Sequence, residues 1–418
     1  MNSANLLDRV LSKIVKRGAL LVTHADGRAA TFGEKADGYP DIGIRFADDK
    51  VARDIMLDPR LGAGEAFMDG RLLIESGDVM GLVQLLRANK PWERGDSLLK
   101  PSPVRRIIGH FSAARESINR QKSARANVAH HYDIGNDLYH LMLDAEHMQY
   151  SCAYWEADTA SLGDAQTAKL AHIAAKLALA PGQHVLDIGC GWGGMAIYLA
   201  NNFDVSVTGI TLSEEQLSLA RARAKEAGVD DRVKFELVDY RDMAARGDQF
   251  DRIVSVGMFE HVGPPQFEVF FSAITQLLSA DGVMLLHTIG RMGSPGSTDA
   301  FTRKYIFPGG YIPALSETVA ASEKFRLIAT DVETLRLHYA RTLRAWYANC
   351  MENQAAIEEL HDERFFRLWT FYLAGATAAF ESGGMCNYQI QYVRSRETLP
   401  ITRDYLAEAE RDLKSAKR

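Results

Sequence analysis

Apolar residues in the first ninety positions recur at the spacing of short helices and strands. Helical spacing covers Leu6 to Val15 and Val79 to Leu86, and strand-like runs cover Ala19 to Val22, Arg28 to Phe32 and Ile42 to Phe46. The turn signal Ala25-Asp26-Gly27 separates the first two strand runs, which predicts a β-hairpin. No cluster of chemically reactive side chains accompanies these elements. We therefore expect residues 1–95 to form a small α+β domain with a packing or lipid-docking role.

The spacing of apolar residues changes after about residue 126, where apolar runs of strand length alternate with helical stretches. The strand runs are Val185 to Ile188, Val205 to Ile210, Val233 to Val238, Ile253 to Val256 and Val283 to Leu286. The helical stretches between them are Met195 to Ala200, a segment from the capping signal Ser213–Gln216 to Gly228, and Pro265 to Leu278. This alternation predicts a parallel sheet with helices on both faces.

Ligands of such sheets bind at the carboxyl ends of the strands. Five residues fall at or just after the predicted strand ends, namely Gly189, Thr211, Asp239, Glu260 and His287. We expect the sheet to bring them together in one site.

The last third of the chain is less regular at first and then strongly apolar. Gly290 to Gly310 is rich in glycine and serine and too long for a plain connection, which predicts a lid loop. Helices are expected over Tyr339 to Leu360 and Phe365 to Ser382, a strand over Asn387 to Val393, and a final helix after Arg403. The second of the two long helices has apolar residues on nearly every face, which fits either a buried core helix or the wall of a hydrophobic substrate channel.

A glycine-rich loop follows the first strand of the alternating region. Residues 185–194 read V-L-D-I-G-C-G-W-G-G, a layout of strand, glycine turn and helix start that is typical of nucleotide-binding corners. A dinucleotide would require an acidic residue at the end of the next strand, and none occurs before Glu214. Asp187 instead suits the positively charged amino-acid end of S-adenosylmethionine (SAM). This stretch favours SAM as the ligand. Taken alone, it also allows a dinucleotide site or a glycine turn with a purely structural role.

Composition narrows the class of protein. The 418 residues suit two or three domains, and the net charge of −6 argues against broad nucleic-acid binding. The four cysteines, Cys152, Cys190, Cys350 and Cys386, form no C-x-x-C pair, so neither a metal site nor a disulfide framework is expected. The sequence shows no secretory signal pattern and no apolar run of membrane-spanning length. We expect a cytoplasmic protein that meets a membrane only from its surface.

A basic connector over residues 96–125 joins the two regions. From Lys100 to Arg125 the chain has seven basic residues and one acidic residue. Four apolar residues, Val104, Ile107, Ile108 and Phe111, share one helical face. Such a segment either lies on an anionic membrane surface or packs against the protein as a solvated linker, and both interpretations remain open.

Read together, the motifs resemble the cyclopropane-fatty-acyl-phospholipid synthase family, which is related to the mycolic-acid cyclopropane synthases. The motifs are Y-D-I-G-N-D-L-Y, M-Q-Y-S-C-A-Y-W, L-D-I-G-C-G-W-G-G, G-I-T-L-S-E-E-Q, S-V-G-M-F-E-H-V-G, H-T-I-G, F-P-G-G-Y-I-P and H-Y-A-R-T-L-R-A-W. They extend from about Tyr132 to Arg394. The resemblance implies a Rossmann-like class I SAM-dependent methyltransferase domain with helical insertions over residues 126–418, preceded by the small α+β domain.

The resemblance also implies a reaction. A methylene group passes from SAM to the cis double bond of an unsaturated phospholipid acyl chain through a carbocation, and bicarbonate acts as the base. The residues that would hold bicarbonate are Cys152, Glu260, His287, Tyr339 and, through its backbone N–H, Ile289. Tyr154 and Trp155 add aromatic faces near the cation. A close alternative is a SAM-dependent fatty-acid C-methyltransferase that gives branched chains on the same fold.

The family pattern assigns SAM to four stretches of the chain. They comprise Tyr150, Ser151, Asp187, Gly189, Cys190, Gly191, Trp192, Gly193, Thr211, Leu212, Ser213, Gln216, Asp239 and Tyr240. His338 and Ala340 flank Tyr339 where better-known bacterial members often have acids, which leaves the substrate branch open. The expected setting is peripheral, on the inner membrane face, with no nucleic-acid partner and with a homodimer as one option.

Overall fold

The computed structural model describes residues 3–95 and 135–415, which fall into two compact units. The first unit contains the described residues up to 95 together with 298–308 and 340–385, and the second contains 135–297, 309–339 and 386–415. The expected basic linker over 96–125, its apolar face and the first residues of the Tyr132 motif lie outside the described residues.

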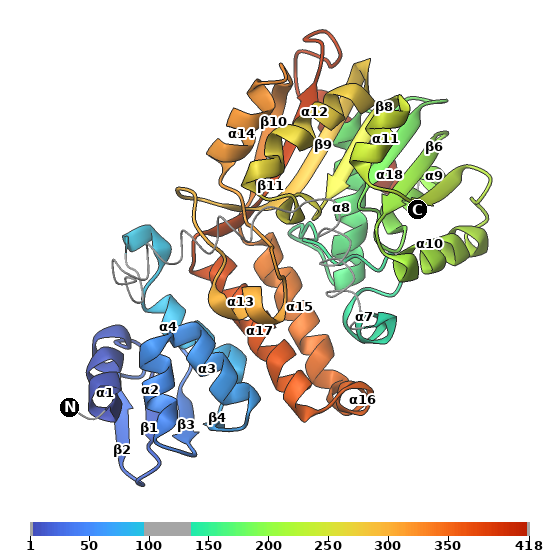
Figure 1. Cartoon of the computed structure of the whole chain (residues 1–418). Helices are drawn as coiled ribbons and strands as arrows, with labels where there is room; N and C mark the ends of the chain where they lie inside the picture. The colour runs from blue at the N-terminus through green and yellow to red at the C-terminus, as the bar shows by residue number, and fades with distance from the viewer. Residues whose placement is uncertain (1–2, 96–134, 416–418) are drawn as a thin grey trace. The chain divides into compact units, whose positions relative to one another are not determined.

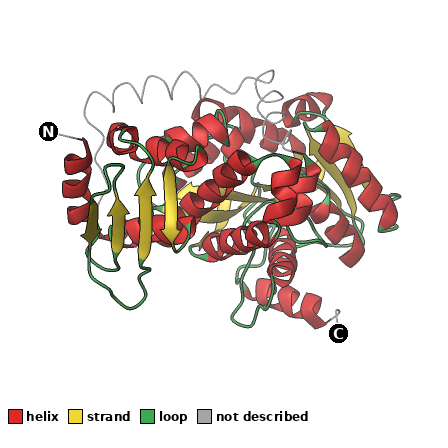
Figure 2. Cartoon of the chain, turned by 90° about the horizontal axis from the view of Figure 1, so that it is seen from below, coloured by secondary structure: helices red, strands yellow, loops and turns green. Residues whose placement is uncertain are grey.

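The first unit contains a four-stranded sheet in the order β2-β1-β3-β4 (Figure 2). Its strands are β1 (Leu20–Thr23), β2 (Ala29–Phe32), β3 (Ile42–Phe46) and β4 (Leu72–Ser76). The pairing of β1 with β2 is antiparallel and places Leu20 opposite Phe32, which confirms the predicted hairpin. Strand β3 is parallel to β1, and β4, which the sequence reading did not predict, is antiparallel to β3.

Helices from both ends of the chain build the rest of this unit. The early ones are α1 (Ser3–Ile14), α2 (Lys50–Leu57), α3 (Pro59–Met68) and α4 (Val79–Ala88). The later ones are α13 (Ala300–Tyr305), α16 (Gln354–Leu360), α17 (Glu363–Glu381) and, from Ala340 onward, α15 (His338–Glu352), whose first two residues belong to the second unit. Helix α17 packs along α3 and α4. The helix expected to run from 339 to 360 is in fact two helices, because Asn353 leaves the helical conformation and starts α16. Asparagine favours such caps over helix interiors.

The second unit contains a seven-stranded sheet in the order β10-β11-β9-β8-β5-β6-β7 (Figure 1). Its strands are β5 (His184–Ile188), β6 (Ser206–Thr211), β7 (Val233–Leu237), β8 (Phe250–Val256), β9 (Leu278–Arg291), β10 (Ile328–Leu335) and β11 (Met385–Val393). The run from β7 through β6, β5 and β8 to β9 is parallel, and β10 is antiparallel to β11. The predicted parallel α/β sheet is thus confirmed.

Alternate residues of each central strand pack on opposite faces of the sheet. Val185 and Val254 belong to a core with α8 (Leu162–Leu177), α9 (Gly194–Asn202) and α10 (Glu214–Glu226). Leu186 and Ile253 belong to a core with α11 (Tyr240–Arg246), α12 (Phe267–Leu277) and α14 (Leu315–Glu323). Two further helices of this unit are α7 (Asn136–Met142) and α18 (Asp404–Ser415), and α18 packs on α8. Layers on both faces leave the strand ends as the place where a ligand can enter.

The stretch expected to be a lid loop, 290–310, differs from that expectation. It contains α13, which begins where the Asp299 side chain accepts a hydrogen bond from the Thr302 N–H at 3.1 Å. A capping aspartate stabilises a helix start, so part of the stretch is regular structure rather than loop. This helix belongs to the first unit.

Candidate cofactor and catalytic site

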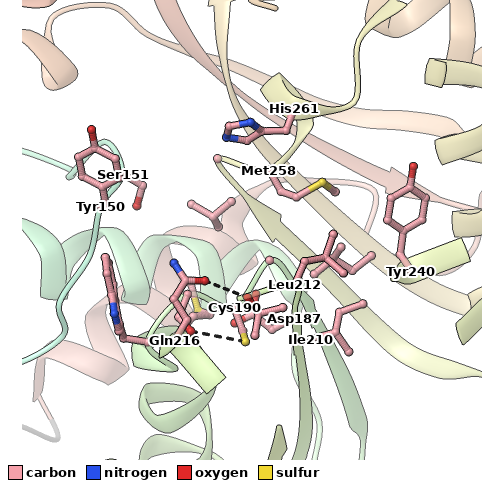
Figure 3. A pocket seen from close by; sticks show the side chains of 18 of the residues that line it. Tyr150, Ser151, Asp187, Cys190, Ile210, Leu212, Gln216, Tyr240, Met258 and His261 are labelled. Carbon is pink, nitrogen blue, oxygen red and sulfur yellow. Dashed lines mark hydrogen bonds between the residues drawn. The ribbon is translucent and has the colours of Figure 1, made fainter. Parts of the chain in front are cut away.

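A pocket in the second unit lies at the carboxyl ends of β5, β6, β7 and β8 (Figure 3). Twelve of the fourteen residues expected to hold the cofactor line it: Tyr150, Ser151, Asp187, Gly189, Cys190, Gly191, Trp192, Thr211, Leu212, Gln216, Asp239 and Tyr240. In the view of Figure 3, Tyr150 and Tyr240 lie on opposite sides, with Asp187 and Cys190 between them. Residues from four stretches of the chain therefore share one cavity.

The other two expected cofactor residues, Gly193 and Ser213, do not line the pocket but support the residues that do. Gly193 precedes α9 with a φ of 81°, and a Cβ atom there would lie 2.6 Å from the Phe235 ring. Ser213 accepts a hydrogen bond from the Gln216 N–H at 3.2 Å and so begins α10, as its spacing predicts. Gln216 in turn accepts a hydrogen bond from the Thr211 hydroxyl at 2.9 Å. These contacts fix the loop and the helix that present the lining residues.

The glycine loop has a backbone that side chains would block. Gly189 has a φ of 81°, and a Cβ atom there would lie 2.9 Å from the Cβ atom of Met258. Gly194 packs against the backbone of the preceding segment, where a Cβ atom would lie 2.1 Å from the His147 carbonyl oxygen. Glycine at 189 lets the loop turn in the left-handed region, and at both positions the missing side chain removes a steric clash.

Asp187 is the buried anion of the pocket. Its Oδ2 atom has no hydrogen-bond partner among the described residues. Burial raises the pKa of this carboxyl to about 7, and the ammonium of Lys169 works in the opposite direction. A buried carboxylate oxygen without a partner is costly unless a ligand supplies a donor or a positive charge.

Asp239 follows β7 as the N-cap of α11 and is held by Arg241, which the sequence pattern did not indicate. The guanidinium makes two contacts, Nε to Oδ1 at 2.7 Å and Nη2 to Oδ2 at 2.6 Å. The Arg241 carbon Cζ also lies 5.3 Å from the centroid of the Tyr240 ring. This fork fixes the carboxylate at the pocket wall and offsets its charge.

Glu260 and Ile289, two of the expected catalytic residues, are in direct contact. The Ile289 N–H donates to Glu260 Oε1 at 2.6 Å, whereas Glu260 Oε2 is buried without a partner in the described chain. Burial raises the pKa of Glu260 to about 7, against the lowering effect of the Ile289 N–H. The N–H expected to face bicarbonate is therefore already used by the carboxyl group.

His287 lies on β9 beside this pair and is fully buried. The amide nitrogens of Asn387 and Gln389 lie 3.4 and 3.2 Å from its two ring nitrogens. An amide nitrogen only donates, and a neutral imidazole accepts at one of its two nitrogens, so the ring can accept from one of the two amides. Burial lowers the pKa of His287 to about 3, which keeps the ring neutral.

Cys152 and Tyr339 complete the expected catalytic set, and both are buried. Burial raises the pKa of the Cys152 thiol well above its ordinary value. Tyr339 lies in the first turn of α15, beside His338, whose Nδ1 atom accepts a hydrogen bond from the Trp155 N–H at 2.9 Å. This bond ties the start of α15 to the segment that carries Cys152.

Tyr154 does not present its ring to the pocket. It stacks on His172 and His338, with centroid distances of 4.2 and 4.8 Å. Two imidazoles thus pack against this ring, and the expectation that its aromatic face lies near the substrate cation stays a prediction.

Several lining residues were not predicted from the sequence, among them Gln149, Arg241, Met258, His261 and Gln266. Helix α8 was not predicted either, although Ser161 and Asp164 form an N-cap signal. In the structure the Ser161 hydroxyl accepts a hydrogen bond from the Asp164 N–H at 3.1 Å. This S-x-x-D pattern before an alanine- and leucine-rich stretch was the available signal.

A parallel sheet with a glycine loop and an acidic pocket at its carboxyl edge defines an α/β protein that binds a nucleoside-containing cofactor. The chain belongs to the mycolic acid cyclopropane synthetase family, whose model matches residues 119–390. It is 39% identical over 371 residues to the cyclopropane-fatty-acyl-phospholipid synthase of Escherichia coli K12, covering 87% of this chain and 91% of that protein. It is also 33% identical over 407 residues to the tuberculostearic acid methyltransferase UfaA1 of Mycobacterium tuberculosis, covering 94% and 92%.

Solved structures agree with this membership. The cyclopropane synthase MmaA2 of Mycobacterium tuberculosis matches with a TM-score of 0.60 and 31% identity, over 64% of this chain and 97% of that one. The mycolic acid cyclopropane synthase CmaA1, solved with SAH and CTAB, matches with a TM-score of 0.60 and 34% identity over the same shares. The α/β fold and the smaller N-terminal α+β region expected from the sequence are thus confirmed.

Proposed function

We propose that this chain is a cyclopropane-fatty-acyl-phospholipid synthase. It transfers a methylene group from SAM to the cis double bond of an unsaturated phospholipid acyl chain. The observation that carries the proposal is the convergence of Gly189, Thr211, Asp239 and the buried Asp187 on one pocket, in a chain 39% identical to a synthase of that name.

The residues of the pocket fit SAM as the co-substrate. The unpartnered Oδ2 atom of Asp187 suits a cationic group, and the bare backbone at Gly189 and Gly191 admits a ligand closely. Asp239, fixed by Arg241, offers further acceptor capacity at the far wall. Burial disfavours the charged form of a carboxyl group, and a cationic ligand bound beside these carboxylates would stabilise that form.

The Glu260 region fits a small anion such as bicarbonate, which when bound supplies the base for proton removal. With a pKa of about 7, Glu260 is partly protonated at neutral pH and can donate through Oε2, which has no partner within the described residues. The ring of His287 stays neutral and adds no competing charge. The Ile289 N–H reaches such an anion only when Glu260 releases it.

Cys152 contributes by staying a thiol. A carbocation is trapped by any strong nucleophile nearby, and a thiolate is one. Burial raises the pKa of Cys152, so the sulfur remains protonated and weakly nucleophilic. The same burial excludes water from this side of the site.

A second candidate is a fatty-acid C-methyltransferase that makes branched chains. A probable fatty acid methyltransferase of Pseudomonas putida is 38% identical over 352 residues, covering 82% of this chain and 85% of that protein. This similarity and the similarity to UfaA1 support the second candidate. Both reactions would share SAM, and they differ in how the cation loses its charge.

The proposed setting is the cytoplasmic surface of the inner membrane, with the acyl chain reached from outside the bilayer. Within the described ranges, no helix is long and apolar enough to cross a membrane. The basic connector would supply the attraction to anionic lipid.

The test incubates the purified full chain with SAM and vesicles of unsaturated phospholipid, with and without bicarbonate. Mass spectrometry should show the addition of one CH2 group to the acyl chain with loss of the double bond, and NMR should show cyclopropane protons. Removal of bicarbonate should lower the rate, and adding it back should restore it. Gly189→Val, which would crowd Met258, is the inactive control. Methyl-branched product would favour the second candidate, and unaltered lipid would overturn both.

A further inference from the structure

Helix α8 buries a lysine directly behind the pocket. Lys169 is fully buried, and its ammonium donates hydrogen bonds to Gln149 Oε1 and, at 3.1 Å, to Ser151 Oγ. Both acceptors are neutral oxygens. A buried ammonium held by neutral groups is expensive, which indicates that the charge has a use beyond local packing.

The two acceptors belong to the pocket wall. Gln149, Tyr150 and Ser151 all line the cavity. One turn earlier on α8, the Gln166 amide donates to the carbonyl oxygens of Gln149 at 3.3 Å and Ser151 at 3.0 Å. Gln166 and Lys169 therefore hold this short wall segment at both backbone and side chain.

The same ammonium acts on the pocket anion. Burial lowers the pKa of Lys169, while the charges of Asp144, Cys152 and Asp187 work against that fall. In return Lys169 lowers the pKa of Asp187, which burial has raised. The two groups therefore titrate as a coupled pair beside the cavity.

The other titratable groups around the pair change charge little near neutral pH. Burial raises the pKa values of the Cys152 and Cys190 thiols, so both stay neutral. Burial lowers the pKa of His287 to about 3 and of His261, on the pocket wall, to about 4. Asp144 accepts the N–H groups of His147 at 2.7 Å and Gln149 at 3.0 Å.

We propose that Lys169 is a positioning residue for SAM: its ammonium holds the Gln149–Ser151 wall and places a positive charge beside the cavity that Asp187 also lines. This inference rests on the proposed function, since it takes SAM as the ligand. A carboxylate attracts the SAM cation and a protonated carboxyl does not. SAM affinity should therefore rise with pH as Asp187 loses its proton, and Lys169 should move that rise to lower pH.

The experiment measures SAM affinity of the full chain by calorimetry from pH 6 to pH 9. Lys169→Met removes the ammonium, so the pH at which affinity rises should shift upward by about one unit, and affinity at pH 7 should fall about tenfold or more. Part of the loss should be recovered at pH 9, where Asp187 is ionised in both proteins. Lys169→Arg keeps the charge and should keep the parent's midpoint.

Lys176→Met is the matched control. Lys176 is the other buried lysine of α8, and it pairs with Asp331 at 3.4 Å and with Glu333, away from the wall. Its loss should lower stability without moving the midpoint for SAM. If Lys169→Met weakens SAM binding equally at every pH, the charge of the lysine does not act on Asp187 and that part of the inference fails; unchanged SAM affinity at every pH would overturn the wall part as well.

Asp187→Asn covers the case in which Lys169→Met does not fold. It should bind SAM weakly, with no rise between pH 6 and pH 9. A retained rise would mean that another group titrates and would overturn the inference. Failure of the parent itself to bind SAM would instead overturn the proposed function.

Discussion

Two buried carboxyl groups, Asp187 and Glu260, have pKa values raised to about 7, and each has one oxygen without a partner among the described residues. Burial is the first cause in both cases, because an apolar setting disfavours the charged form. The Ile289 N–H, which donates to Glu260 Oε1 at 2.6 Å, is the first of the groups that lower the pKa of Glu260 against burial, and the charge of Lys169 does so for Asp187. Both sites are therefore unstable when empty and ionised, which is the state that a ligand would relieve.

Glu260→Gln should become more stable, relative to the parent, as pH rises from 5 to 8. The folded state holds the Glu260 proton up to about pH 7, whereas the reference value is 4.5, so the parent loses stability across that window. The glutamine has no proton to lose and still offers an oxygen to Ile289. The gain at pH 8 should be on the order of 2 kcal/mol in the free energy of unfolding. Urea unfolding at both pH values checks it. Exposed Glu352→Gln is the control, and a gain that does not change with pH would refute the argument.

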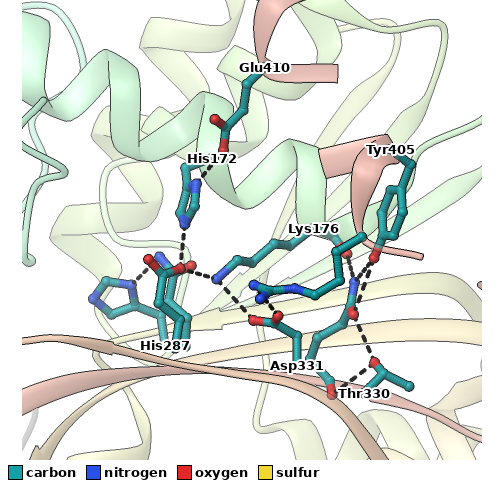
Figure 4. Close-up of polar contacts among 11 residues, drawn as sticks. His172, Lys176, His287, Thr330, Asp331, Tyr405 and Glu410 are labelled. Carbon is teal, nitrogen blue, oxygen red and sulfur yellow. Dashed lines mark hydrogen bonds and ion pairs between the residues drawn. The ribbon is translucent and has the colours of Figure 1, made fainter. Parts of the chain in front are cut away.

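At the scale of elements, α8 joins parts of the second unit that are far apart in the sequence (Figure 4). His172 is bonded to Glu333 of β10 at 2.7 Å and to Glu410 of α18 at 2.5 Å. Lys176, one turn further, also contacts Glu333, whose pKa falls to about 2; burial opposes that fall, and His172 and Lys176 cause it. Polar contacts of this kind fix which elements pack together, because an unpaired partner would be left buried.

His172→Gln should destabilise the protein more at pH 6 than at pH 9. The pKa of His172 is raised: burial lowers it, but the bonds to Glu333 and Glu410 outweigh burial. Its contribution is therefore fully present below the reference value of 6.5 and is lost as pH rises through the folded value. Thermal unfolding of parent and variant at the two pH values measures the difference. Exposed His140→Gln should show little effect at either pH, and an equal loss from His172→Gln at both would contradict a charged His172.

At the scale of the molecule, the chain builds each unit from separate segments. The first unit takes α13, α16 and α17 from the far end of the sequence, and α17 packs against α3 and α4 there. The second unit is likewise completed by β10, β11 and α18. Truncation near residue 340 would therefore remove parts of both units.

The remaining prediction concerns the basic connector, which lies outside the described residues and is argued from charge alone. Reversing Arg105, Arg106 and Arg115 to Glu should weaken binding to anionic vesicles strongly at low salt, because each basic residue near such a surface contributes about 1 kcal/mol. SAM affinity should be unchanged. Co-sedimentation across a salt series measures the effect. Equal pelleting of variant and parent would assign membrane contact to another part of the chain.

The sequence by itself determined the features that depend on a few neighbouring residues. The glycine turn at Gly189, the Ser213 cap and the existence of the central strands follow from local backbone preference and from apolar runs of strand length. Because parallel strands align their carboxyl ends, these local features also predicted that Gly189, Thr211 and Asp239 share one site, and all three line the pocket. The other nine cofactor residues that line it were expected from the family resemblance, and β9 runs on to Arg291 instead of ending at His287 as expected.

Tertiary structure alone decided which groups are charged and which are already bonded. Three features depend on contacts between distant segments: the Ile289 N–H is bonded to Glu260, Tyr154 stacks on two imidazoles, and Lys169 donates to Gln149 and Ser151. No spacing rule contains those contacts, and a buried pKa depends on everything packed around the group. The sequence thus specified the kinds of residues in the site, and packing determined their ionisation and their partners.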